Sequence, residues 1–150
     1  MEVSSLLSEE LIKLNLESDN KEDAINELID ILANAGKVSD KEEFKEVIFA
    51  REAQSSTGVG KGIAIPHGKS NVVTEPSIAF AKVDKGIDFD SLDDQPANLF
   101  FMIAVPEDAA KDHLKVLSQL SRKLMHDDFR EALLTADNKE EILEIIKEQE

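Results

Sequence analysis

A layered α/β domain is the fold class that this sequence predicts, on two observations. Segments with the apolar spacing of helices alternate along the chain with short apolar segments that are typical of strands. With 150 residues, of which 41% are hydrophobic, the chain is long enough to bury one core, and it contains no internal repeat, linker or low-complexity tract. We therefore expect residues 1–150 to form a single domain.

The first third of the chain predicts one strand followed by two helices. Apolar and polar residues alternate over residues 12–16, as in a half-buried strand. Asn20 is a plausible N-cap for a helix whose apolar spacing ends at Gly36. Asp40 occupies the same position before a second helix, which we expect to end at about Ala53.

Segment 57–68, with the sequence Thr-Gly-Val-Gly-Lys-Gly-Ile-Ala-Ile-Pro-His-Gly, is the most informative part of the chain. Glycine occupies every second position at its start, which suits neither a helix nor a strand. We expect a loop whose bare backbone N–H groups can approach a ligand closely. The apolar residues 63–65 then predict a short buried strand.

His67 is the first candidate for chemistry, because it lies between Pro66 and Gly68 at the end of this predicted strand. Pro66 restricts the residue before it to extended geometry. A neutral imidazole is a good nucleophile near pH 7, and its attack on phosphorus gives a reactive P–N bond. The alternative is a turn histidine that bonds a neighbouring carbonyl, but the surrounding glycines favour function.

The second half of the chain predicts two more strands and three helices. Residues 77–83 have strand character, Lys85-Gly86 predicts a turn, and the apolar run 99–105 is typical of a strand buried on both faces. Helical spacing then covers three segments, at residues 112–125, 127–134 and 138–147.

Four parts of the chain resemble one family. Segment 57–68, Arg51, the run Asn-Leu-Phe-Phe-Met-Ile-Ala-Val-Pro at 98–106 and Asp112-His113-Leu114 are similar to IIA domains of the bacterial phosphoenolpyruvate-dependent sugar phosphotransferase system, of the fructose/mannitol class. The resemblance extends over about residues 6–146. It implies a central mixed β-sheet flanked by helices, the mannitol/fructose-type IIA fold, and a phosphoryl group carried by His67.

Arg51 continues an apolar helical stripe formed by Phe44, Val47 and Ile48. A guanidinium on the buried side of a helix should have an anionic partner. A cation that stabilises the last helical turn is also common. The resemblance implies that Arg51 lies in the phosphorylation site, where it can stabilise charge on the transferring oxygens.

His113 and Thr57 are weaker site candidates. His113 lies in the first turn of a predicted helix, where it could pack or, because a helix N-terminus attracts anions, approach a phosphoryl group. The resemblance implies the second role. The Thr57 hydroxyl either donates to a phosphoryl oxygen or caps its turn. Together with Thr57, four glycines complete the expected phosphoryl-binding loop: Gly58, Gly60, Gly62 and Gly68. His126 is predicted to be a surface residue.

Composition excludes several classes of function. With 17 basic and 32 acidic residues the net charge is −15, which disfavours nucleic acid and anionic membranes and suits either a basic protein partner or solubility alone. The chain has no cysteine, no signal peptide and no long apolar run, so we expect a cytoplasmic protein without membrane insertion. The histidines lack metal-ligand spacing and no nucleotide-binding glycine motif fits, so we expect no metal and no cofactor.

The resemblance implies a sugar-specific phosphotransferase component. His67 would accept a phosphoryl group from the histidine-containing phosphocarrier protein and pass it to a cysteine of a cognate IIB domain, which works with a membrane IIC permease. The alternatives are a nitrogen-type regulatory IIA protein and a IIA-like module of a transcriptional regulator. Residues 85–92 and 94–96 look more like the fructose-type transporters. The chain could also be an excised domain of a longer permease.

Overall fold

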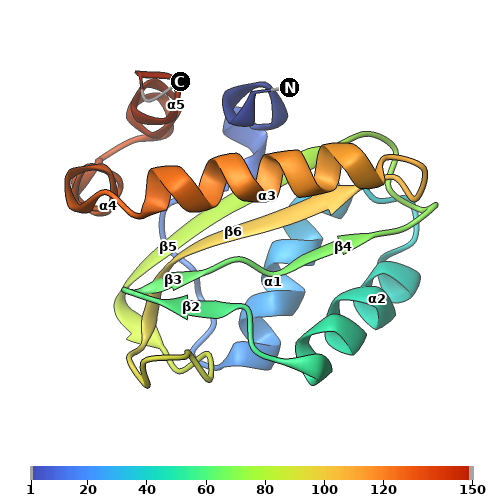
Figure 1. The fold of residues 1–150 in the computed structure, drawn as a ribbon, viewed down its shortest axis with the longest axis horizontal. Coiled ribbons are helices and arrows are strands. Elements are labelled where there is room, and N and C mark those ends of the chain that lie inside the picture. The colour runs from blue at the N-terminus through green and yellow to red at the C-terminus, as the bar shows by residue number, and fades with distance from the viewer. Residues whose placement is uncertain (1, 149–150) are drawn as a thin grey trace.

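A six-stranded mixed sheet is the centre of the computed structural model, which describes residues 2–148 except the side chains of Ala110, Asp112 and His113 (Figure 1). The strands are β1 (Ile12–Lys13), β2 (Gly58–Gly60), β3 (Ile63–Ala64), β4 (His67–Lys69), β5 (Ser77–Ile87) and β6 (Ala97–Val105). They lie in the order β1-β5-β6-β3-β2, and β4 also pairs with β6. Antiparallel pairs join β5 to β6 and β2 to β3, and the other pairs are parallel, which confirms the mixed sheet.

Two groups of helices cover the sheet (Figure 1). The first is α1 (Lys21–Asn34) and α2 (Lys41–Gln54), which pack against each other. The second is α3 (Ala110–Leu124), α4 (Asp127–Thr135) and α5 (Lys139–Glu148), where α3 contacts β6. Two short 3-10 helices, η1 (Val3–Leu6) and η2 (Glu9–Leu11), precede β1, and η1 packs beside α5.

Side-chain caps begin both helices of the first group, as the sequence predicts. The Asn20 side-chain oxygen accepts a hydrogen bond from the backbone N–H of Asp23 at 2.9 Å. Asp40 accepts in the same way from Glu43 at 3.2 Å. Each contact satisfies a donor that the first helical turn leaves without a backbone partner.

Two predicted strand boundaries are wrong. The first strand covers only residues 12–13, instead of 12–16. Lys85-Gly86 forms no turn, since both residues lie inside β5 at an irregular register where Gly86 has a φ of 76°. The strand continues there because its pairing with β6 resumes at Ile87, opposite Ala97. A glycine accommodates such a bulge without ending the ladder.

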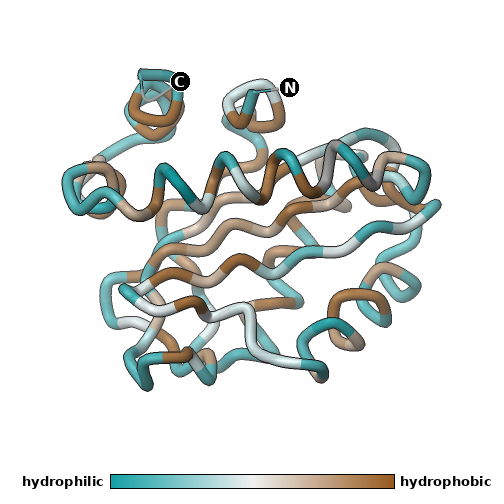
Figure 2. The backbone as a smooth tube through the Cα atoms, viewed as in Figure 1, coloured by the Kyte–Doolittle hydropathy of each residue, from teal (hydrophilic) through white to brown (hydrophobic). Residues whose placement is uncertain are grey.

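Strand β6 runs through the core. All of its residues except Asn98 are buried, which confirms the prediction of a strand covered on both faces. The hydrophobic segments in Figure 2 follow the central strands, and the polar segments lie on loops and on outer faces of helices. Two edge-to-face phenylalanine pairs pack in the core. The ring centroids are 5.0 Å apart for Phe80 and Phe101 and 5.7 Å apart for Phe89 and Phe100.

A buried lysine ties the sheet to the C-terminal helices. Lys82 of β5 is 6% exposed, and its Nζ donates to the carbonyl oxygens of Leu133 at 3.0 Å, Leu134 at 3.0 Å and Ala136 at 2.6 Å. These carbonyls lie at the C-terminal end of α4, where the helix itself supplies no N–H partner. A cation is also favourable at this end of the helix dipole.

We expect Lys82→Met to lower the free energy of unfolding by about 3 kcal/mol, because it removes the donor to three carbonyl oxygens, two of them in buried contacts. Urea unfolding followed by circular dichroism measures the change. Lys85→Met, an exposed position of the same strand, is the control and should shift stability by no more than about 0.5 kcal/mol. Equal unfolding midpoints for the two variants would contradict the capping role of Lys82.

Candidate functional site

His67 is the first residue of β4, which continues the line of β3 along β6 after a short break. β3 and β4 pair with β6 at the same offset, so Ile65 and Pro66 interrupt a single register. Proline has no N–H for the ladder. The carbonyl oxygen of Ile65 instead lies 2.9 Å from Nδ1 of His67. A carbonyl can only accept, so Nδ1 carries the proton of the neutral ring and the lone pair is on Nε2.

The glycine after His67 lets a helix approach this strand. A Cβ at Gly68 would lie 2.9 Å from Cγ1 of Val47 and 3.1 Å from Cδ1 of Ile48. The apolar stripe of α2 therefore packs directly on β4, beside which it lies in Figure 1. Close helix–strand packing accounts for Gly68, and it holds the C-terminal turn of α2 near His67.

Arg51 lies in that last turn of α2 and is half-buried. Its Nη1 donates to the carbonyl oxygen of Ser55 at 2.9 Å and lies 3.4 Å from the Ser55 hydroxyl. Among the described residues, no ion pair joins Arg51 to a carboxylate, so the anionic partner expected from the sequence is not found within them. The guanidinium keeps further N–H donors that can bind oxygens of an anionic group.

The surroundings of His67 favour its neutral form. Partial burial lowers the pKa of His67 below its ordinary value of 6.5, and the positive charge of Arg51 lowers it further. The hydrogen bond to Ile65 and the carboxylate of Glu52 act in the opposite direction, with less effect than burial. Arg51 is thus one of the charges that act on the imidazole, and its contact with a phosphoryl group stays a prediction.

The glycine-rich segment is a hairpin and not an open loop, which corrects the sequence prediction. Gly58 belongs to β2, and its amide donates to the Ser56 hydroxyl at 3.0 Å, so this N–H is not bare. Gly60 and Gly62 have φ values of 99° and 78°, which the tight connection to β3 requires. Pairing with a buried strand outweighs the low strand propensity of glycine.

Thr57 makes contacts that the sequence does not reveal. It is 3% exposed, and its hydroxyl donates to a carboxylate oxygen of Glu52, whose other oxygen accepts from the Thr57 amide at 3.2 Å. The hydroxyl proton is therefore not directed at a phosphoryl group. Sequence reasoning missed Glu52, although its position four residues after the buried Ile48 places it towards the covered side of α2.

His113 lies in the first turn of α3, as predicted, but its side chain is outside the described residues. Further along α3, Val116, Leu120 and Leu124 are buried, so this helix packs on the core at helical spacing. The role of His113 as a hydrogen-bond partner for the phosphoryl group stays a prediction. His126 is exposed, which confirms its assignment to the surface.

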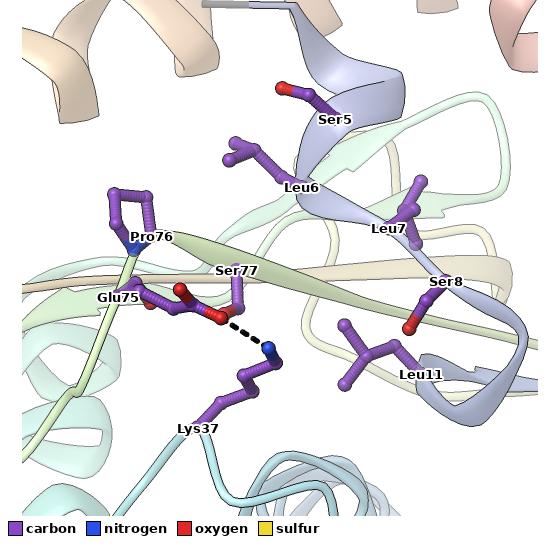
Figure 3. A pocket seen from close by; sticks show the side chains of 9 residues that line it. All are labelled: Ser5, Leu6, Leu7, Ser8, Leu11, Lys37, Glu75, Pro76 and Ser77. Carbon is purple, nitrogen blue, oxygen red and sulfur yellow. Dashed lines mark hydrogen bonds and ion pairs between the residues drawn. The ribbon is translucent and has the colours of Figure 1, made fainter.

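A hollow of about 280 Å³ lies elsewhere, between η1, η2 and the start of β5 (Figure 3). Lys37 and Glu75, which form an ion pair, are among the residues that line it, and none of the predicted site residues does so. Among residues 2–148, no cluster of three or more His, Asp or Glu side chains is arranged to bind a metal ion. Every helix within these residues is too short or too polar to span a bilayer.

Comparison with known sequences assigns the family. The family described as phosphoenolpyruvate-dependent sugar phosphotransferase system, EIIA 2, matches residues 5–149. The chain is 45% identical over 147 residues to the fructose-specific EIIA component of Haloferax volcanii, covering 98% of this chain and 96% of that protein. It is 47% identical over its full length to the fructose-specific EIIABC component of Bacillus subtilis, of which it spans 24%. The chain therefore belongs to the EIIA 2 family of phosphotransferase components.

Solved structures agree with this assignment. The nitrogen regulatory protein IIA-Ntr of Neisseria meningitidis superimposes with a TM-score of 0.89 at 34% identity, over 96% of this chain and 98% of that chain. The IIA mannitol protein of Escherichia coli superimposes with a TM-score of 0.81 at 27% identity, over 93% and 98%. A complex of the Escherichia coli mannitol IIA and phosphorylated IIB enzymes contains a chain that matches with a TM-score of 0.82 at 26% identity, over 95% and 97%. These matches confirm the predicted IIA fold.

We expect His67 to titrate below pH 6.5, and Arg51→Met to raise its pKa because a nearby positive charge is removed. A nucleophilic imidazole must be neutral, so a lower pKa would extend any reaction of His67 to a lower pH in the wild type than in the variant. NMR titration of the imidazole protons measures both pKa values. Lys41→Met removes the same charge at the exposed start of α2 and should leave the pKa of His67 unchanged. A pKa that is equal in wild type and Arg51→Met would place Arg51 away from His67.

Proposed function

We propose that His67 is the phosphoryl acceptor of this EIIA component and that Nε2 is the attacking atom. One observation carries the proposal: the Ile65 carbonyl bonds Nδ1 of His67, and this directs the lone pair to Nε2. The pKa of His67, lowered by burial, keeps the ring neutral near pH 7. An imidazole in this form can act as a nucleophile without a separate base.

The donor in this proposal is the phosphohistidine of the histidine-containing phosphocarrier protein. Nε2 of His67 forms a P–N bond as the P–N bond of the carrier breaks, and the carrier imidazole keeps that electron pair. Positive charge develops on the His67 ring, where the Nδ1–H bond to Ile65 becomes charge-assisted. Arg51 supplies donors to the phosphoryl oxygens, so that positioning and charge neutralisation lower the barrier. His113 is proposed as a second donor.

The acceptor is a cysteine of a cognate IIB domain, whose thiolate forms a P–S bond while the P–N bond to His67 breaks. One structural relative comes from a complex of a mannitol IIA enzyme with its phosphorylated IIB enzyme, and this supports a IIB domain as partner. The IIB domain would work with a membrane IIC permease. The net charge of −15 would favour docking of a carrier with a basic surface.

Several sequence expectations stay predictions within this proposal. They include phosphoryl contacts from the amides of Gly60 and Gly62, a cytoplasmic location, and residues 1–150 as one complete IIA phosphocarrier domain. Neither metal nor cofactor enters the proposed transfer. We do not propose a phosphoryl contact for the Thr57 hydroxyl, because it donates to Glu52.

A regulatory IIA function is the second candidate. A nitrogen regulatory protein of Bradyrhizobium diazoefficiens is 34% identical over 146 residues, covering 97% of this chain and 95% of that protein. The two fructose-specific relatives are more similar, at 45% and 47%. We therefore favour a fructose-type transport role over the regulatory role. A module of a transcriptional regulator has less support still.

We expect His67→Gln to abolish phosphorylation. Wild-type protein incubated with labelled phosphoenolpyruvate, enzyme I and the carrier protein should take up one phosphoryl group that is labile in acid and stable in alkali. His126→Gln is the matched control at an exposed histidine and should be labelled like the wild type. Label on the His67→Gln variant would show that the acceptor is another residue.

Transfer to a IIB domain should distinguish transport from regulation. Phosphorylated protein mixed with IIB domains of the fructose class should lose its phosphohistidine rapidly, and replacement of the IIB cysteine by serine should stop the loss. Decay of phosphohistidine is followed by gel electrophoresis of the labelled protein. Phosphohistidine that persists in the presence of every fructose-class and mannitol-class IIB domain tried would favour the regulatory role.

A further inference from the structure

A buried carboxylate lies one residue after Arg51 and takes no part in the transfer described above. The Glu52 side chain is 5% exposed, and Nζ of Lys21 lies 2.9 Å from its Oε2. The backbone amide and the hydroxyl of Thr57 both donate to the same carboxylate. Lys21, Glu52 and Thr57 thus form a compact polar cluster, and we call it the Glu52 cluster.

The Glu52 cluster connects three segments that are distant in the sequence. Lys21 is the first residue of α1, Glu52 lies in the last turn of α2, and Thr57 precedes β2. Nζ of Lys21 also lies 4.8 Å from the ring centre of Phe89, which positions the ammonium from another side. The end of α2 is therefore fixed to the edge of the sheet by directed contacts as well as by apolar packing.

The hydrogen bonds continue from Thr57 to the reacting ring. The Thr57 carbonyl accepts from the amide of Ile65 at 2.9 Å. The carbonyl of the same Ile65 accepts from Nδ1 of His67 at 2.9 Å. Ile65 is thus held through its N–H while its C=O holds the imidazole. A path of hydrogen bonds leads from Glu52 through two residues to His67.

We propose that Glu52 is a positioning residue for phosphoryl transfer: bonded to Thr57, it fixes both Ile65, which orients His67, and the helix end that carries Arg51. The inference rests on the proposed function of His67. Arg51 and Glu52 are adjacent on α2, so the bond from Glu52 to Thr57 fixes the backbone from which Arg51 reaches the site. Small displacements of the reacting groups lower the reaction rate strongly. A connection that holds these groups in place should therefore affect the rate.

A carboxylate suits this task for two reasons. Its two oxygens accept from the amide and the hydroxyl of Thr57 together, which fixes direction as well as distance. The ion pair with Lys21 offsets part of its charge, which lessens the repulsion of an incoming phosphoryl group. A buried ion pair contributes little net stability compared with apolar packing, so the cluster is better explained by orientation than by stability.

Three variants test the inference. Thr57→Val removes the hydroxyl and keeps the side-chain shape, Thr57→Ser keeps the hydroxyl, and Glu52→Gln removes the charge and one acceptor. We expect Thr57→Val and Glu52→Gln to lower the maximal single-turnover rate of phosphorylation about tenfold or more. The carrier concentration that gives half of the maximal rate should not change. Thr57→Ser should restore the rate to within about threefold of wild type.

Asp90→Asn is the matched control, because it removes the exposed second partner of Lys21, 3.4 Å away, and leaves Glu52 in place. It should react at the wild-type rate. Nitrogen NMR of the His67 ring provides the second measurement: the share of the Nδ1–H tautomer should fall in Thr57→Val and not in Asp90→Asn. Circular dichroism at the assay temperature establishes that each variant is folded.

The outcomes separate the inference from the proposed function. Wild-type protein that takes no label on His67 would overturn the proposed function itself. If the wild type is labelled on His67 and folded Thr57→Val and Glu52→Gln react at the wild-type rate, only the positioning role is overturned. The same holds if these variants change only the carrier concentration that gives half of the maximal rate. If one variant fails to fold, the other decides. Failure of both to fold would assign the Glu52 cluster to stability and overturn the inference.

Discussion

The hydrogen bond between Nδ1 of His67 and the carbonyl oxygen of Ile65 is the interaction on which the site depends. It lies at the break between β3 and β4, where Ile65 and Pro66 stand, and the Ile65 carbonyl reaches the imidazole two residues later. The break is local, since the register on either side is the same. The sheet therefore holds the ring, and one peptide group selects the ring nitrogen that keeps the lone pair.

The fold could be predicted where local chemistry decides it. Asn20 and Asp40 are good helix caps in isolation, and the apolar run of β6 has no other plausible place than a core. The prediction from sequence fails where pairing with a segment far along the chain determines the local structure. Gly58 joins a strand because β3 is available to pair with it, and Gly86 stays within β5 because β6 continues opposite. No single-residue propensity contains that information.

The residues of the site also divide into those that local sequence marks and those that only the folded structure reveals. His67 and Arg51 could be named from the sequence, because a proline, a nearby glycine and a helical phase mark them. Glu52 could not, since an acidic residue beside an arginine on a helix is ordinarily solvated. Its burial depends on Lys21, which approaches from α1, and on Thr57, which the β2–β3 hairpin holds in place. The sequence also allowed two uses for the Thr57 hydroxyl, and the contact with Glu52 is neither of them.

The central claim is that the ring is held as the Nδ1–H tautomer and receives the phosphoryl group on Nε2. Long-range proton–nitrogen NMR spectra of histidine-labelled protein, recorded before and after phosphorylation, test it directly. The unphosphorylated protein should give the nitrogen shifts of an Nδ1–H ring for His67 at a pH above its pKa, and the phosphorylated protein should show phosphorus coupling to Nε2. An Nε2–H ring in the unphosphorylated protein, or a phosphoryl group on Nδ1, would contradict the account.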